Sequence, residues 1–179
     1  MIRHNSAEQK PLFPKIIVYS SNTGYSEQYA KMISRALNVP AYRIGEVPAC
    51  HEDAYALYVG WLFAGRVVGY KKAEKHYNVF VIVAVGMSPP SPEIVEGIRK
   101  AEDVALEMRI CYLQGGFDIN RLSLPLKLIM KVKCRQIAAR LRAKGELTEA
   151  EQLTLEMTQH PTSAVREENI QQVIDLYKD

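Results

Sequence analysis

The run of apolar residues at 79–85 constrains the fold of this chain more than any other segment. Its sequence, Val-Phe-Val-Ile-Val-Ala-Val, is rich in β-branched residues and far shorter than a membrane span. A strand that is apolar on both faces must be covered on both sides, as the central strands of a parallel sheet are. The segment therefore predicts an α/β protein built on a parallel sheet.

The rest of the chain alternates strand and helix patterns, as a doubly wound sheet requires. Strands are expected at residues 15–20, 41–44, 54–60, 79–85 and 107–113. Helices are expected at residues 26–37, 71–77, 124–144 and 167–177, with two more opening at the cap residues Ser91 and Thr148. Residues 60–69 and 114–118 are expected to be loops. This pattern predicts five parallel strands with helices on both faces, and ligands at the carboxyl ends of the strands.

The length of 179 residues fits one domain, residues 15–179, after a polar N-terminal extension at residues 1–14 without the apolar stretch of a secretory signal. No apolar run reaches the roughly 18–20 residues of a membrane span. Cys50, Cys111 and Cys134 lie far apart, so neither a disulfide framework nor a zinc site is expected. A cytoplasmic setting fits this cysteine usage, and Cys111 is expected in the core.

The segment from Ile119 to Gly145 carries the strongest charge signal in a chain whose formal net charge is only +3. It contains no acidic residue and eight basic ones, namely Arg121, Lys127, Lys131, Lys133, Arg135, Arg140, Arg142 and Lys144.

As a helix, this segment would separate its charges from its apolar residues. Lys127, Lys131 and Arg135 recur every fourth residue, with Arg142 nearby. Another face carries Leu126, Met130, Ile137 and Leu141. Two interpretations stay open: the basic face is simply solvated, or it contacts an anionic membrane peripherally.

The loop after the first expected strand carries the chemistry. It consists of Ser21, Asn22, Thr23, Gly24, Tyr25 and Ser26. Hydroxyl, amide and backbone N–H groups meet there at a helix N-terminus, which suits an anion. Because the loop lacks Lys and Arg and the Gly-Lys-Ser/Thr ending of a P-loop, a terminal phosphate held by neutral donors is expected. The alternative is an ordinary N-cap turn rich in Ser and Thr.

The sequence Ser-x-Thr-Gly-x-Ser between a strand and a helix is similar to the phosphate loop of flavodoxins, which holds the phosphate of FMN. The resemblance covers residues 14–113 and, more loosely, the last helix. It implies a flavodoxin-like doubly wound sheet with the strand order 2-1-3-4-5. It also implies FMN as the cofactor.

Three further loops are implied in flavin binding by the resemblance. The loop after the third strand, with Gly60, Trp61, Leu62, Phe63, Ala64 and Gly65, would cover one face of the ring; alternatively, Trp61 and Phe63 cap the core. The loop after the fourth strand, with Gly86, Met87 and Ser88, lacks the tyrosine that usually stacks on the flavin. After the fifth strand, Gly115, Gly116 and Phe117 would border the flavin or form a tight turn, with Asp118 as a cap.

The Gly-Gly-Phe-Asp loop followed by a long basic helix resembles the branch of the flavodoxin-like family that includes menaquinone-dependent protoporphyrinogen oxidase. That resemblance implies an FMN-dependent oxidoreductase that passes electrons to a quinone. An electron-transfer flavodoxin is the first alternative, although such proteins are typically acidic and this chain is basic. The second alternative is a flavin-free binding module. We predict no catalytic triad and expect no nucleic-acid partner.

Overall fold

The computed structural model describes residues 11–178. The strands are β1 (Ile16–Ser20), β2 (Ala41–Arg43), β3 (Tyr55–Phe63), β4 (Arg66–Val67), β5 (Asn78–Gly86), β6 (Arg109–Gln114), β7 (Gly116–Phe117) and β8 (Thr162–Ser163). The α-helices are α1 (Tyr25–Leu37), α2 (Tyr70–Ala73), α3 (Pro92–Glu102), α4 (Leu124–Ala143), α5 (Glu149–Met157) and α6 (Gln171–Ile174). The 3₁₀ helices are η1 (Ala49–His51), η2 (Ile119–Arg121), η3 (Glu167–Ile170) and η4 (Asp175–Tyr177).

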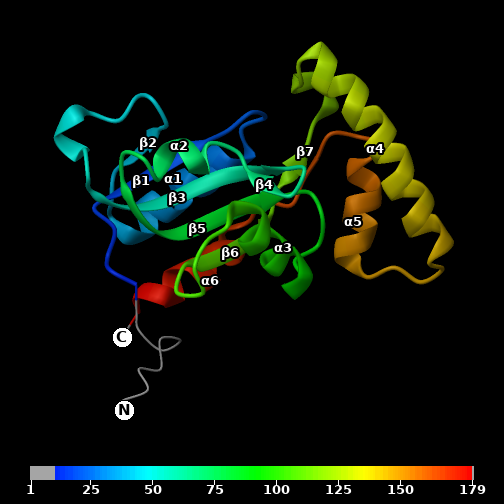
Figure 1. Ribbon diagram of the computed structural model, residues 1–179. Helices are drawn as coiled ribbons and strands as arrows, with labels where there is room; N and C mark the ends of the chain where they lie inside the picture. Colours follow the sequence, from blue (N-terminus) through cyan, green and yellow to red (C-terminus); the bar gives the residue numbers. More distant parts are fainter. Residues whose placement is uncertain (1–10, 179) are drawn as a thin grey trace.

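Five of the strands form a parallel sheet in the order β2-β1-β3-β5-β6 (Figure 1). Counted in chain order, these strands stand as 2-1-3-4-5, which confirms the predicted topology. The register pairs Tyr19 of β1 with Val59 of β3, and Val59 with Val83 of β5. This is a flavodoxin-like α/β fold. The order in which the strands are added to the sheet reverses at β1, and ligands bind at such a point in doubly wound sheets.

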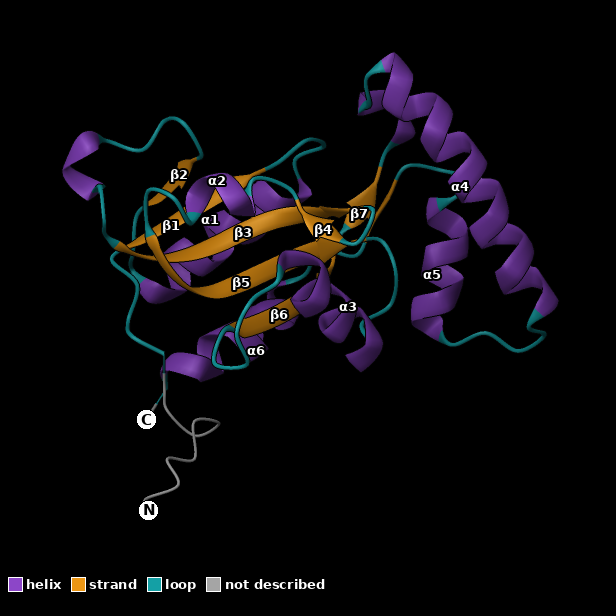
Figure 2. Ribbon diagram, viewed as in Figure 1, coloured by secondary structure: helices purple, strands orange, loops and turns teal. Residues whose placement is uncertain are grey.

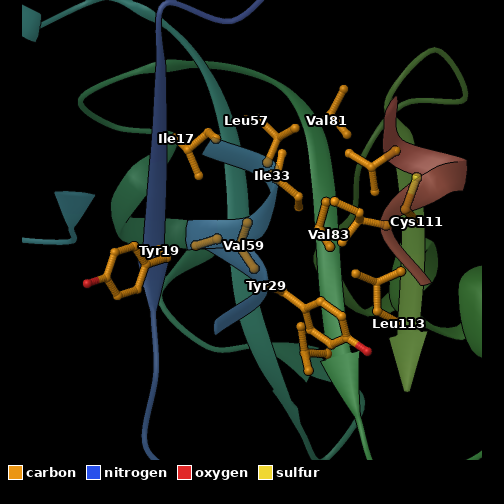
Figure 3. Close-up of a cluster of buried hydrophobic side chains, with 14 of the residues drawn as sticks. Ile17, Tyr19, Tyr29, Ile33, Leu57, Val59, Val81, Val83, Cys111 and Leu113 are labelled. Atoms are coloured by element: carbon orange, nitrogen blue, oxygen red, sulfur yellow. The ribbon is translucent and has the colours of Figure 1, made fainter. Parts of the chain in front are cut away.

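One face of the sheet packs against α1 and the C-terminal turns. Tyr29 and Ile33 of α1 are fully buried against Leu57, Val59 and their neighbours, as the close-up in Figure 3 shows. Cys111 belongs to this cluster, so its predicted core position is confirmed, and burial raises the pKa of its thiol to about 11. Alternate residues of the same strands point to this face because side chains alternate along a strand.

The opposite face of the sheet packs against α2 and α3. Tyr58 and Ile82 come from the sheet, whereas Tyr70 of α2 and Ile98 of α3 cover them. The sheet is therefore buried on both faces, as the apolar sequence of residues 79–85 predicts.

The prediction of a loop at residues 60–69 is wrong for residues 60–63, which belong to β3. The third strand continues to Phe63 and returns as β4, so the two form an antiparallel hairpin. Ala64 and Gly65 make the turn with φ values of 49° and 81°. Two residues with positive φ form the kind of turn that matches the twist of a hairpin. Gly60 lies within the strand and does not end it.

Three other expectations need correction. The helix expected at residues 71–77 is only the short α2, because the next strand begins at Asn78, whose N–H donates to the Ala54 carbonyl. The loop at residues 114–118 contains β7, which pairs with β8. The helix expected at residues 167–177 is divided into η3, α6 and η4. Of the expected extension at residues 1–14, residues 1–10 lie outside the described part of the chain.

Two helices stand beside the carboxyl edge of the sheet as an antiparallel pair. Figure 2 shows α4 and α5 next to β7, set apart from the two helical layers. The predicted capping box opens α5: Thr148 accepts from the Glu151 N–H, and Glu151 accepts from the Thr148 N–H. A third apolar cluster, which includes Phe117, Cys134 and Met157, fastens the pair to the body of the protein.

Candidate functional site

The loop of residues 21–26 joins β1 directly to α1 at the carboxyl edge of the sheet. Gly24 is the N-cap, with φ 95°, a left-handed conformation that glycine adopts without strain. No side chain caps the helix. The Ser21 hydroxyl instead accepts from the Gly24 N–H at 3.1 Å. The first N–H groups of α1 therefore remain without a side-chain acceptor, as in helix termini that bind anions.

Three other polar side chains of this loop are uncommitted. Within residues 11–178, the side chains of Asn22, Thr23 and Ser26 make no hydrogen bond. Ser26 is only 1% exposed. It lines the cavity described below, so its hydroxyl can reach a ligand there. The arrangement therefore suits an acceptor-rich group such as a phosphate.

A cation that the sequence analysis did not assign to the site lies against this loop. Arg121 of η2 donates from Nη1 to the Thr23 carbonyl oxygen at 3.0 Å. Its Nε lies 3.2 Å from Oδ2 of Asp118, which also caps η2 through the Asn120 N–H, as expected for a cap residue. Sequence reasoning missed this cation because 98 positions separate Arg121 from Thr23.

The same pair influences Tyr25. Burial raises the pKa of the Tyr25 phenol, the carboxylate of Asp118 raises it further, and the guanidinium of Arg121 opposes both. The aromatic ring of Tyr25 lies so close to Gly116 that a side chain there would overlap it. The phosphate-loop region and the loop after β6 are therefore in direct contact.

A cavity of about 90 Å³ opens next to the loop. It brings together twelve residues that the sequence analysis assigned to the site, namely Ser21, Asn22, Thr23, Tyr25, Ser26, Trp61, Leu62, Phe63, Gly86, Met87, Gly116 and Phe117. The remaining candidates do not line it: Gly24, Gly60, Ala64, Gly65, Ser88 and Gly115. All four predicted loops thus meet at one place, although three of them contain strand residues.

Two of these glycines, Gly60 and Gly115, are required by close packing. A Cβ atom on Gly60 would lie 2.6 Å from Cγ1 of Val67, and one on Gly115 would lie 2.6 Å from Cγ1 of Val85. Both distances are far shorter than van der Waals contact allows. Close packing of the hairpin and of β6 therefore explains these residues without any ligand.

Three residues of the α4 region line the cavity and were not expected there: Leu122, Leu126 and Met130. The helical periodicity of the sequence places Leu126 and Met130 on one apolar face of α4, and both residues line the cavity. With them in place, the cavity is smaller than the roughly 300–1,000 Å³ of ordinary ligand pockets.

The hairpin that carries Trp61 and Phe63 is fixed by one buried carboxylate. Glu102, at the end of α3, is 1% exposed and accepts from the Val67 N–H at 2.7 Å. Its second oxygen, Oε2, has no hydrogen-bond partner, and Nη1 of Arg66 lies 4.0 Å away. This interaction joins the hairpin of β3 and β4 to helix α3.

Replacing Glu102 by alanine is expected to lower the free energy of unfolding by about 1–3 kcal/mol, because the buried Val67 N–H loses its acceptor. Glu102→Gln retains an acceptor oxygen and is expected to lie closer to the wild type. Urea unfolding followed by circular dichroism measures both variants. Equal stability of the alanine variant and the wild type would contradict a role for Glu102 in fixing the hairpin.

No cluster of three or more His, Cys, Asp or Glu side chains in residues 11–178 is arranged to hold a metal ion. Comparison with known protein families and with curated proteins finds no match to this chain.

Proposed function

We propose that this protein binds FMN, with its phosphate at residues 21–26. The observation that carries the proposal is an uncapped helix N-terminus surrounded by uncommitted polar side chains at a mainly apolar cavity. The donor set fits a phosphate, which accepts hydrogen bonds from backbone N–H groups and hydroxyls. Aromatic and aliphatic walls, including Trp61, Phe63 and Met87, fit a planar ring system.

The size of the cavity sets a condition on this proposal. A flavin ring requires more than about 90 Å³, so Leu122, Leu126 and Met130 must withdraw when it binds. Leu126 and Met130 belong to α4, and Leu122 lies shortly before that helix, so all three lie outside the two main packing layers. The same small cavity favours a second candidate function, a flavin-free module in which α4 permanently closes the site.

When bound, FMN supplies hydride and one-electron chemistry, and the protein positions the flavin and tunes it. We propose an oxidoreductase that passes electrons to a quinone. The loop after β5 presents Met87 to the cavity and contains no aromatic residue, so one side of the site is open to a reacting molecule once α4 withdraws. The net charge of +3 disfavours an electron-transfer flavodoxin that docks on basic partners.

Titration of the purified protein with FMN, FAD, riboflavin and NAD tests the proposal, with flavin fluorescence and calorimetry as readouts. We expect FMN to bind tightest, riboflavin to bind more weakly, and NAD not to bind. Tighter binding of FAD, or no flavin binding at all, would refute FMN as the ligand, and the latter would support the flavin-free module. For the redox step, anaerobically reduced holoprotein should be reoxidised by a water-soluble naphthoquinone.

Arg121→Gln is expected to weaken FMN binding several-fold, up to about tenfold, because one charge-assisted contact near the phosphate is lost at a largely exposed position. Riboflavin, which lacks the phosphate, should bind both proteins equally. Lys100→Gln, on the exposed surface of α3, is the matched control. An equal loss for riboflavin and FMN would show that Arg121 acts on the fold of the loop and not on the phosphate.

A further inference from the structure

The outer face of α4 exposes large apolar side chains to solvent. Leu124, Leu128, Ile129 and Val132 are 77%, 67%, 50% and 55% exposed. They make up half of the large apolar side chains exposed on residues 11–178, and all four fall within three helical turns. Single exposed apolar residues are common, but a contiguous group indicates a contact surface.

These residues form a strip along the helix. Leu124, Leu128 and Val132 follow one another at intervals of four residues, so they lie above one another on one side. The inner side of the same helix contacts the protein through Met130, Cys134 and Ala138. The helix is therefore apolar on two opposite sides, and only one of them is covered by the described chain.

Basic side chains border the exposed strip on both sides. Lys131 and Arg135 lie three positions after Leu128 and Val132, and Lys133 lies four positions after Ile129. Residues at these spacings are neighbours on a helix surface.

Most of the cations in this segment have no counterion. Arg121 pairs with Asp118, and Lys144 pairs with Glu151. No ion pair or hydrogen bond within residues 11–178 involves the side chains of Lys127, Lys131, Lys133, Arg135, Arg140 and Arg142. This concentration of unpaired positive charge requires an anionic partner or solvent counterions.

A groove between α4 and α5 brings three of these cations together. Lys131, Arg135 and Arg142 line a hollow of about 490 Å³, with Thr158 and Gln159 on its other wall. Cations and polar donors around an open groove provide contacts for an anionic headgroup beside the apolar strip.

We infer that the outer face of α4, with its apolar strip and flanking cations, docks on the surface of an anionic phospholipid bilayer. The apolar side chains enter the interface between headgroups and acyl chains, and the cations bind lipid phosphates, as in other interfacial helices. No helix in residues 11–178 has both the length and the hydrophobicity to cross a bilayer, so the contact is peripheral.

Two features favour a lipid surface over a second copy of the chain. A symmetric contact between two copies would place the cations of one α4 beside those of the other, and like charges repel. The strip also lies on a helix that stands beside the main body, where a flat surface can approach it (Figure 1). The inference does not require flavin binding, because its residues face away from the cavity.

Sedimentation with vesicles of phosphatidylcholine, with and without phosphatidylglycerol, tests the docking surface. We expect binding only to the anionic vesicles, and we expect it to weaken steeply as salt is raised. The triple variant K131Q/K133Q/R135Q should weaken the partition coefficient on the order of a hundredfold. L128S/V132S should also weaken it, by at least tenfold. Thermal unfolding checks that both variants fold.

Two control variants alter equally exposed residues elsewhere. L106S removes an apolar side chain that is 82% exposed, and K72Q/K75Q/K100Q removes three exposed cations. Both should bind vesicles like the wild type. No binding at low salt, or equal losses in test and control variants, would overturn the inference. Concentration-dependent self-association that L128S/V132S abolishes, without vesicle binding, would identify a second copy as the occupant and equally overturn it.

Discussion

Replacing Thr23 by valine is expected to weaken FMN binding by roughly ten- to a hundredfold. A hydrogen bond from a hydroxyl to a charged group contributes about 1.5–3 kcal/mol, and valine retains the shape of threonine without the hydroxyl. The Thr23 side chain makes no hydrogen bond within residues 11–178, so its removal leaves no other protein group without a partner. The substitution should therefore lower the affinity for FMN without lowering the stability of the fold. Fluorescence titration measures the dissociation constant.

Riboflavin separates a phosphate contact from a general loss of the site. Thr23→Val should leave riboflavin affinity unchanged, and Ser26→Ala should behave in the same way. Thr158→Val, directly after α5, is the control for loss of a threonine hydroxyl away from the cavity, although it also removes a hydrogen bond to the Leu155 carbonyl. If Thr23→Val binds FMN with the wild-type dissociation constant, the phosphate does not lie at this hydroxyl, and the assignment of residues 21–26 fails.

The sheet could be predicted from the sequence because a strand buried on both faces requires a continuous run of apolar residues, which is visible locally. Residues 79–85 are apolar throughout, and residues 16–19 repeat the pattern in shorter form. The limits of the elements were harder to place where tertiary packing decides them. Gly60 resembles a strand end, yet it lies inside β3, where the close approach of Val67 requires a glycine.

The candidate site was predictable to the extent that it lies on loops at one edge of a parallel sheet. Their convergence follows from topology, so Thr23, Trp61 and Met87 could be grouped before their contacts were known. Arg121 and Leu126 could not be grouped with them. Both come from the segment after β7, and no local pattern indicates that this segment folds back over the edge of the sheet.

The two sides of α4 show why periodicity alone gave an incomplete description of this helix. The sequence pattern identified an apolar side with Met130 and Leu141 and a basic side with Lys131 and Arg135. It did not identify Leu128 and its neighbours as a second apolar strip, which is exposed. A helix with apolar residues on two sides has no single hydrophobic direction, so only its packing shows which side is covered.

Gly69→Ala is expected to lower the free energy of unfolding by about 3 kcal/mol. Gly69 has φ 88°, which alanine adopts only with strain. A Cβ atom there would also overlap the hydroxyl of Tyr58, which is buried and donates to the Val68 carbonyl at 2.7 Å. Overpacking of this kind typically adds about 1–3 kcal/mol to the strain.

Two other glycines separate the contributions to this loss. Gly65 has φ 81° but no atom within 4 Å of the Cβ position, so Gly65→Ala should lose only the backbone part, about 1 kcal/mol. Gly97 lies inside α3 with open space around it, and Gly97→Ala should gain about 0.5–1 kcal/mol. Urea unfolding gives all three values. If Gly69→Ala loses no more stability than Gly65→Ala, the Tyr58 side chain moves aside without strain, and overpacking adds nothing to the cost at Gly69.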